Sequence, residues 1–139
     1  MAISTHWRWT MRETSTQGAI SPLFVMWNIL YAGGLFSRTC QNAECSDGTQ
    51  AVGIAGWSTD ANNGAGDWVG LAYGLVQYNV VFAITLDSYH HVLVGGYITG
   101  YCLDLNCTTS MPARHIAEFN PYEFSWIALG LGLNDNVYA

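Results

Sequence analysis

Apolar and polar residues alternate or run in short blocks along this chain, and Gly, Asn, Asp and Ser interrupt them at short intervals. Alternation is the period of a strand with one buried face, whereas a helix repeats its apolar positions every three to four residues. The clearest alternation lies near the N-terminus, where Trp7, Trp9 and Met11 share one face. We predict an N-terminal edge strand over residues 3–12, with these three side chains as a candidate assembly face.

Five further segments are rich in Val, Ile, Tyr, Phe and Trp, as strands usually are. They span residues 23–31, 68–73, 79–86, 92–101 and 124–131. Residues 113–119 are a helix candidate that Asn120-Pro121 ends, because the residue before a proline disfavours the helical conformation. Many short strands with polar, Gly-containing turns predict an all-β fold. We expect residues 1–139 to form one domain, a jelly-roll-like β-sandwich.

The chain also repeats a pattern of two glycines, five residues, a cysteine, four residues and a second cysteine. It begins at Gly33 and again at Gly95. A second match, between residues 68–75 and 126–133, follows in the same order and with nearly the same offset. Self-similarity at a fixed offset is the mark of a repeat, so we predict an internal duplication of about 60 residues. The pseudo-repeats would cover approximately 20–75 and 83–133. The alternative is chance reuse of similar segments in a Gly-rich, aromatic β protein.

All four cysteines, Cys40, Cys45, Cys102 and Cys107, fall in this repeated pattern. Their even number and polar flanking residues favour disulfides, but the sequence does not choose among the three connectivities. A structural zinc site is an alternative, since two closely spaced cysteine pairs suit tetrahedral zinc. Free thiols are a third.

Composition narrows the class of function. Only 10% of the residues are charged, while 50% are hydrophobic and 14% aromatic. A soluble domain usually carries about a quarter charged residues. A neutral surface of this kind suits a protein that packs against copies of itself or other proteins, or one that binds sugars. The net charge of -6 and four scattered arginines argue against nucleic acid, whose phosphates attract clustered Lys and Arg.

No segment is expected to span a membrane or to direct secretion. The most apolar run, residues 18–36, contains Pro22, Asn28 and the Gly33-Gly34 pair, whereas a spanning helix needs about 20 uninterrupted apolar residues. The first residues have neither the basic start nor the apolar core of a secretory signal. Disulfides without such a signal imply oxidation after release from the cell, as in a virion or another extracellular assembly.

One polar loop is a candidate binding site. It contains Asp60, Asn62, Asn63 and Asp67, flanked by Trp57 and Trp68. Oxygen-rich loops can hold calcium, and indole rings offer flat faces to a sugar. The alternative is a solvated turn. We expect one tryptophan to offer its face and the other to belong to the core, with Trp57 the more exposed of the two.

Catalytic chemistry has no recognisable pattern in the sequence. The nucleophile-elbow, zinc-protease and phosphate-loop motifs are absent. His90 and His91 lie between two strand-like segments, where we expect a pair at a turn or core edge rather than a metal site. We therefore expect a non-enzymatic protein that needs no cofactor, with calcium and structural zinc as the alternatives.

A set of features in the first half follows a recognisable order. They are His6-Trp7-Arg8, Gln17-Gly18, the apolar segment 24–34, Trp57-Ser58, and the segment 62–74, which contains a Trp-Val-Gly strand and ends in Gly. Together they resemble the discoidin-like (galactose-binding-like) domains of phage tail and virion proteins, over residues 6–86. Asn28 stands where that family usually has an acidic residue. The resemblance implies a β-sandwich in a virion context.

These observations lead to two hypotheses. The first is a structural subunit of a virus or phage particle, or of a similar extracellular assembly, that associates with itself or with other virion proteins. The second is a lectin-like carbohydrate-binding module that uses the tryptophan-flanked loop to bind glycans.

Overall fold

The computed structural model describes residues 2–4 and 28–139. Within them the chain forms ten strands and one 3-10 turn, Asn62–Gly64, and no α-helix. The strands are β1 (Ala2–Ser4), β2 (Ile29–Gly33), β3 (Ile54–Ser58), β4 (Asp67–Val69), β5 (Val80–Leu86), β6 (Val92–Tyr97), β7 (Gly100–Cys102), β8 (Ser110–Pro112), β9 (Ile116–Asn120) and β10 (Ser125–Ala128). The predicted all-β fold is confirmed.

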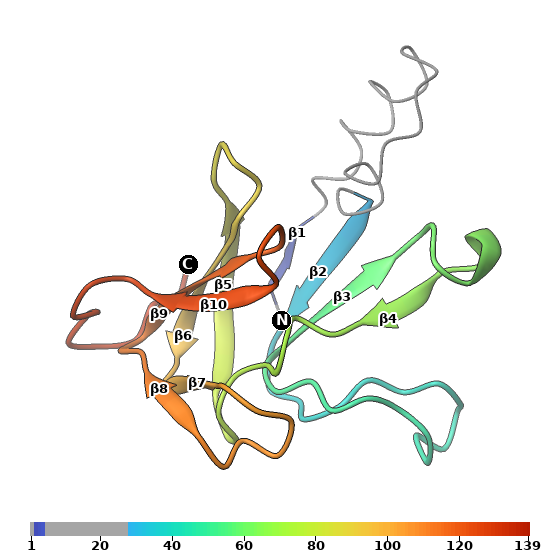
Figure 1. The fold of residues 1–139 in the computed structure, drawn as a ribbon, viewed down its shortest axis with the longest axis horizontal. Helices are drawn as coiled ribbons and strands as arrows, with labels where there is room; N and C mark the ends of the chain where they lie inside the picture. Colours follow the sequence, from blue (N-terminus) through green and yellow to red (C-terminus); the bar gives the residue numbers. More distant parts are fainter. Residues whose placement is uncertain (1, 5–27) are drawn as a thin grey trace.

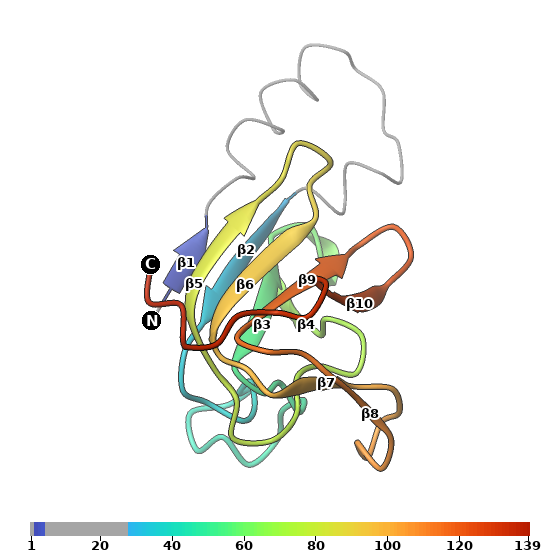
Figure 2. The same cartoon turned by 90° about the vertical axis from the view of Figure 1, so that its left-hand side faces the viewer.

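Eight of these strands form two four-stranded antiparallel sheets, ordered β1-β2-β3-β4 and β10-β9-β6-β5, while β7 and β8 form a separate hairpin (Figure 1). The sheets meet where β5 packs against β1 and β2, as in a β-sandwich (Figure 2). Within each sheet the strands follow chain order, with the β7–β8 hairpin inserted between β6 and β9. The described strands therefore form two meanders, whereas a jelly roll would join its sheets by Greek-key crossings.

The two sheets share a pairing register. When one constant number is added to both residues of a β2–β3 pair, the result is a β6–β9 pair. The recurring pairs are Gly33–Ile54 with Gly95–Ile116, Leu30–Trp57 with Val92–Phe119, and the single bridge Arg38–Gln50 with Gly100–Pro112 of the hairpin. An internal duplication requires such a constant offset, and the duplication itself stays a prediction.

The apolar core draws on both sheets and on the segments that join them. Its buried members are Tyr31, Ile54, Leu71, Leu75, Val81, Val92, Val94, Ile98, Tyr101, Ala113, Ala117, Phe119 and Trp126. The Trp126 indole also donates a hydrogen bond to the Leu71 carbonyl oxygen at 2.8 Å, across 55 residues of chain. Gly33 lets the sheets approach closely, because a Cβ there would lie 2.6 Å from a Val81 methyl group.

The helix expected over residues 113–119 is wrong, because the segment contributes strand β9. Ala117 and Phe119 are buried while the residues on either side of them in the strand are half-buried, which is the two-residue period of a strand. The strand expected over residues 68–73 ends early, at Val69. The chain turns just beyond it, since Ala72 has a φ of 50°.

The candidate assembly face of Trp7, Trp9 and Met11 lies outside the described residues, as does most of the predicted N-terminal strand. The described part, β1, is the first strand in its sheet, and among the described strands it pairs with β2 alone. None of the described residues belongs to a helix with the length and apolarity that crossing a bilayer requires.

Candidate functional site

The four cysteines form two local disulfides, Cys40–Cys45 and Cys102–Cys107, with Cα separations of 4.6 and 4.8 Å. The predicted disulfides are confirmed, and the connectivity that the sequence left open is the local one. No cysteine is free. The alternatives of a four-thiolate zinc site and of free thiols are therefore wrong.

The first disulfide loop is organised by Asn42. Its backbone carbonyl accepts a hydrogen bond from the Cys45 N–H at 3.1 Å. Its side-chain oxygen accepts one from the Ser46 N–H at 3.0 Å, and its amide nitrogen donates one to the Ser46 hydroxyl at 2.7 Å. Cys45 takes the left-handed conformation that closes the turn, with a φ of 54°.

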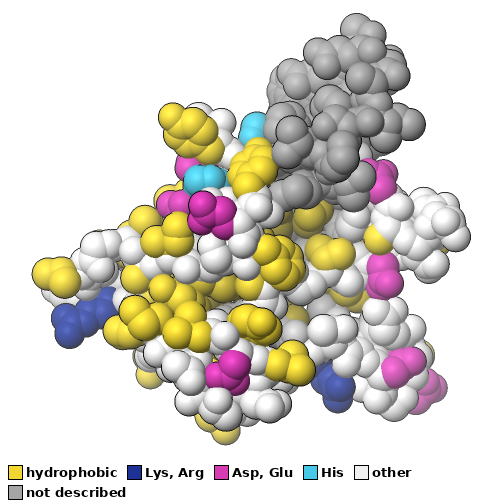
Figure 3. All heavy atoms as spheres, in the orientation of Figure 1, with side chains coloured by type: hydrophobic (Ala, Val, Ile, Leu, Met, Phe, Trp, Pro, Cys, Tyr) yellow, Lys and Arg dark blue, Asp and Glu magenta, His cyan; other side chains and the backbone are white. Residues whose placement is uncertain are grey.

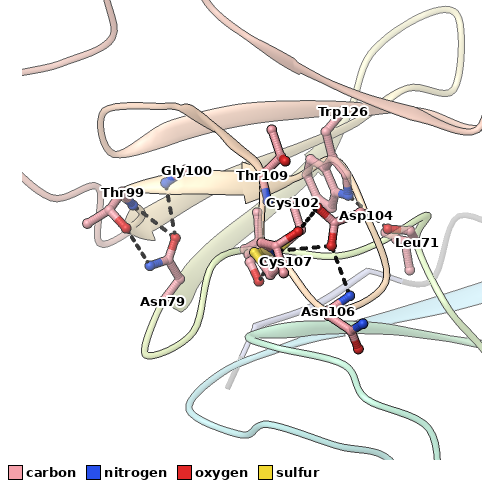
Figure 4. The surroundings of a disulfide bond; sticks show 12 residues. Leu71, Asn79, Thr99, Gly100, Cys102, Asp104, Asn106, Cys107, Thr109 and Trp126 are labelled. Carbon is pink, nitrogen blue, oxygen red and sulfur yellow. Dashed lines mark hydrogen bonds between the residues drawn. A yellow bond between two sulfur atoms is a disulfide. The ribbon is translucent and has the colours of Figure 1, made fainter.

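Asp104 organises the second disulfide loop from the equivalent position (Figure 4). Its carbonyl accepts from the Cys107 N–H at 3.0 Å. Its carboxylate accepts from the Thr108 N–H at 3.0 Å and from the Thr108 hydroxyl at 2.8 Å. Cys107 also has a φ of 54°. The two loops thus share the pattern Cys-x-Asn/Asp-x-x-Cys-Ser/Thr and hydrogen bonds between equivalent residues. The side chain donates to the hydroxyl in the first loop and accepts from it in the second.

The carboxylate of Asp104 is held in its charged form. The hydrogen bonds from the Thr108 backbone and hydroxyl, with further ones from the Thr109 and Asn106 N–H groups, lower the pKa of Asp104 to about 2. A carboxylate that accepts several such bonds is favoured over the neutral acid. The negative charge of this loop is therefore fixed at any ordinary pH.

A buried amide anchors the start of the β7–β8 hairpin (Figure 4). Asn79 is 1% exposed. Its nitrogen donates to the Thr99 hydroxyl at 2.9 Å, and its oxygen accepts from the Thr99 and Gly100 N–H groups at 2.9 and 3.4 Å. A buried amide satisfied in this way orders the backbone around it. It thereby orders the start of the hairpin that carries the second disulfide loop.

A polar cleft of about 610 Å³ lies between the second disulfide loop and the segments that flank the first one. It is lined by Ser37, Arg38, Gln50, Val52, Val76, Gln77, Asn106 and Cys107. The Arg38 guanidinium donates to the Gly48 carbonyl oxygen at 3.2 Å, which ties it to its own loop. The lining offers amides and a hydroxyl but no aromatic platform.

The tryptophan-flanked loop connects β3 to β4. Trp57 and Trp68 are directly opposite each other in the sheet, with ring centroids 5.3 Å apart in an edge-to-face arrangement. Both are half-buried, and Gly66 packs so closely on the Trp57 indole that a Cβ there would lie 2.4 Å from the ring. The two rings therefore pack on each other and on the loop backbone, leaving part of each exposed.

The two carboxylates of this loop accept hydrogen bonds from amide groups of the protein itself. The Asp60 carboxylate accepts a hydrogen bond from the Asn28 side chain at 2.6 Å. The Asp67 carboxylate accepts from the Gln41 side chain and from the Trp68 N–H, both at 2.8 Å. Asn62 and Asn63, which the sequence grouped with them, are exposed at the tip. A calcium ion here would compete with these amide donors.

The structure assembles a third cluster that the sequence did not group. Asp87, at the end of β5, His91, just before β6, and Glu118, in β9, bring their side-chain ligand atoms within 4.8 Å of one another. It is the one such group of His, Cys, Asp or Glu among the described residues that could hold a metal ion. His90 lies in the turn as expected, with a φ of 65°. Glu118 was hidden from sequence analysis because it lies far beyond His91 along the chain, inside the segment expected to be helical.

Comparison with known proteins gives no relative: no family model, no curated protein and no solved structure matches this chain. The resemblance to discoidin-like domains therefore stays a prediction.

Proposed function

We propose that this chain is a non-enzymatic structural subunit of an extracellular assembly, such as a virion, that binds copies of itself through neutral apolar surface. The observation that carries the proposal is the number of large hydrophobic side chains left exposed. Fifteen of them are exposed among the described residues, including Leu131 at 93%, Leu35 at 81%, Tyr78 at 78% and Leu105 at 73%. Exposed apolar patches on a soluble protein usually mark an interface.

Part of this apolar surface lies on the second disulfide loop and the hairpin next to it. Leu103, Leu105 and Met111, which we call the apolar arm, are 46%, 73% and 46% exposed. Figure 3 shows hydrophobic side chains gathered over β8, β9 and β10, next to this loop. The arm carries no basic residue. A second copy of this chain, itself poor in charge, is the partner that suits such a neutral surface, and symmetric contacts between copies are the usual arrangement.

The disulfides support the extracellular setting. Disulfides persist in oxidising environments and are rare in reducing ones. Here they also fix the conformation of the loop that carries the apolar arm. A bridge that closes so short a loop contributes about 2 kcal/mol to stability in the chain-entropy model.

The variant Leu105→Glu tests the role of the apolar arm. It places a charge on an exposed position, so we expect the fold to persist while self-association weakens by about tenfold or more, the usual effect of losing a well-packed contact. Sedimentation velocity over a concentration series measures this. Asn134→Glu, which adds the same charge at an exposed polar position in another loop, is the matched control. Equal association of the wild type and Leu105→Glu would contradict the proposed arm.

Carbohydrate binding is the second candidate, because Trp57 and Trp68 stay partly exposed beside the exposed amides of Asn62 and Asn63. Flat indole faces and amide groups are the means by which proteins hold neutral sugars. Glycan-array binding that Trp57→Ala abolishes, and that Leu105→Glu leaves unchanged, would support it. An array without a binding glycan would remove this candidate.

A further inference from the structure

The turn between β5 and β6 is tightly ordered. Asp87 and His91 close it, with the Asp87 N–H donating to the His91 carbonyl oxygen and the His90 N–H donating to that of Asp87, each at 3.1 Å. Three residues lie between them, and the last, His90, is left-handed. This is a common three-residue hairpin connection. It fixes the backbone of two side chains, Asp87 and His91, that lie next to each other.

The Asp87 carboxylate is held by one of its two oxygens. Oδ1 accepts hydrogen bonds from the Tyr89 and His91 N–H groups, at 2.8 and 2.9 Å. The other oxygen, Oδ2, lies 3.4 Å from His91 Nδ1. The turn thus orients the carboxylate and presents Oδ2 toward the imidazole.

Glu118 reaches the same nitrogen from the neighbouring strand. Its Oε1 lies 2.8 Å from His91 Nδ1. The side chains of His91, Asp87 and Glu118 are 20%, 29% and 16% exposed, so all three are largely withdrawn from water. His91 Nδ1 thus lies within ion-pair distance of both carboxylates. Two carboxylate oxygens, one from the turn and one from strand β9, converge on one imidazole nitrogen.

We propose that Asp87, His91 and Glu118 bind a zinc ion through Asp87 Oδ2, His91 Nδ1 and Glu118 Oε1. Zinc accepts imidazole nitrogen and carboxylate oxygen together, at about 2.0–2.2 Å from each. In a tetrahedral site, ligands at that distance lie roughly 3.3–3.6 Å from one another. The 3.4 Å between Asp87 Oδ2 and His91 Nδ1 has this spacing. The 2.8 Å between Glu118 Oε1 and His91 Nδ1 is a hydrogen-bond distance, which would open by about 0.5 Å when zinc replaces the proton. Calcium and magnesium prefer all-oxygen sites, so the imidazole selects a transition metal.

Three protein ligands leave a coordination position open, as in zinc sites that bind a water or a ligand. Beside the cluster is a hollow of about 510 Å³, lined by Ser88, Tyr89, His90, His91 and Tyr122. The Tyr89 and Tyr122 rings lie 6.1 and 6.2 Å from the His91 ring, centroid to centroid. The hollow thus borders the His91 ligand and two aromatic side chains, with room for a small oxygen donor.

The test is zinc binding by isothermal titration calorimetry on the full chain, with Asp87→Asn and Glu118→Gln as variants. Asp87→Asn keeps an oxygen that can cap the turn but replaces the ligand oxygen by an amide. Glu118→Gln keeps the shape of the side chain. Glu123→Gln, an exposed residue outside the cluster, is the matched control. Magnesium serves as the control metal.

We expect one zinc ion per chain for the wild type and for Glu123→Gln, and affinity about tenfold or more lower for each ligand variant. A change in the NMR signal of His91 Nδ1 on zinc addition would identify the bound nitrogen. Near-ultraviolet circular dichroism of each variant checks that the fold persists. The proposal is overturned if the wild type binds no zinc at micromolar concentrations, or if folded Glu118→Gln binds it as tightly as the wild type.

Discussion

At the scale of single residues, Asn42 and Asp104 stabilise two loops of one shape with different chemistry. Each accepts the N–H of the residue four positions on and contacts its hydroxyl. An amide keeps these bonds at every pH. A carboxylate keeps its full set only while it is charged. We therefore predict that acid affects the second loop, which Asp104 stabilises, and leaves the first loop, which Asn42 stabilises, unchanged.

Acid should loosen the second loop alone. The pKa of Asp104 in the folded protein, about 2, is below the value of about 3.9 for an unfolded aspartate. Its contribution to stability is thus complete above pH 4 and is lost as the pH falls through 2. The amide NMR signals of Thr108 and Thr109 should titrate near pH 2, while that of Ser46 stays constant. Asp104→Asn should abolish the titration, and a midpoint near pH 4 would contradict the proposed role of these hydrogen bonds.

The sequence predicted the residues of the tryptophan loop but not their roles. Asp60 and Asp67 were grouped as candidate ligand residues, with a solvated turn as the alternative, because they are close in sequence. In the folded chain they accept bonds from Asn28 and Gln41, which are 32 and 26 residues away. Partners at such separations depend on the packing of the strands, so local pattern could not reveal them.

At the scale of elements, the two disulfide loops are equivalent in more than their cysteines. In the first loop the Gln41 N–H donates to the Asp47 carbonyl oxygen, and in the second Leu103 donates to Thr109, both at 2.9 Å. Each loop lies between two strands that pair in one sheet, the first between β2 and β3 and the second between β6 and β9. The two loops therefore share one backbone arrangement. We predict that one loop can replace the other, and a chimera can test this.

Replacing residues 40–46 by the sequence of residues 102–108 should give a folded protein with two disulfides. The grafted segment supplies the same capping positions, with an aspartate in place of Asn42. Mass spectrometry of the oxidised protein should find both bridges local, and the melting temperature should change by only a few degrees. As a control, the same graft with its aspartate changed to alanine should be less stable. A chimera that scrambles its disulfides would contradict the equivalence.

Strands made of bulky apolar residues could be predicted from the sequence, whereas a strand that contains small residues could not. Segments with bulky residues, such as β5 and β6, lie within the ranges predicted as strands. Strand β3 was missed because Ala55 and Gly56 interrupt its apolar pattern. Gly56 is needed there, since a Cβ would lie 2.8 Å from an Ile29 methyl group. Close packing between neighbouring strands thus hides a strand from a prediction based on composition.

At the scale of the whole molecule, two meanders with one register pack through β5 and place their disulfide loops at the same end (Figure 1). The spacing of the cysteine pattern along the chain indicated this repeated register. The connectivity of the strands could not be predicted from spacing, because the same strands can be joined in several orders. The low charge of the sequence indicated a neutral surface, and the structure shows many apolar side chains exposed on it. Such a surface suits contact with another protein.

Native mass spectrometry of the purified protein, with and without reductant, tests the proposed self-association most directly. We predict an oligomer at micromolar concentration that dissociates when reductant opens the loop carrying the apolar arm. A species of 15.2 kDa that stays monomeric at high concentration under oxidising conditions would contradict the proposed structural role.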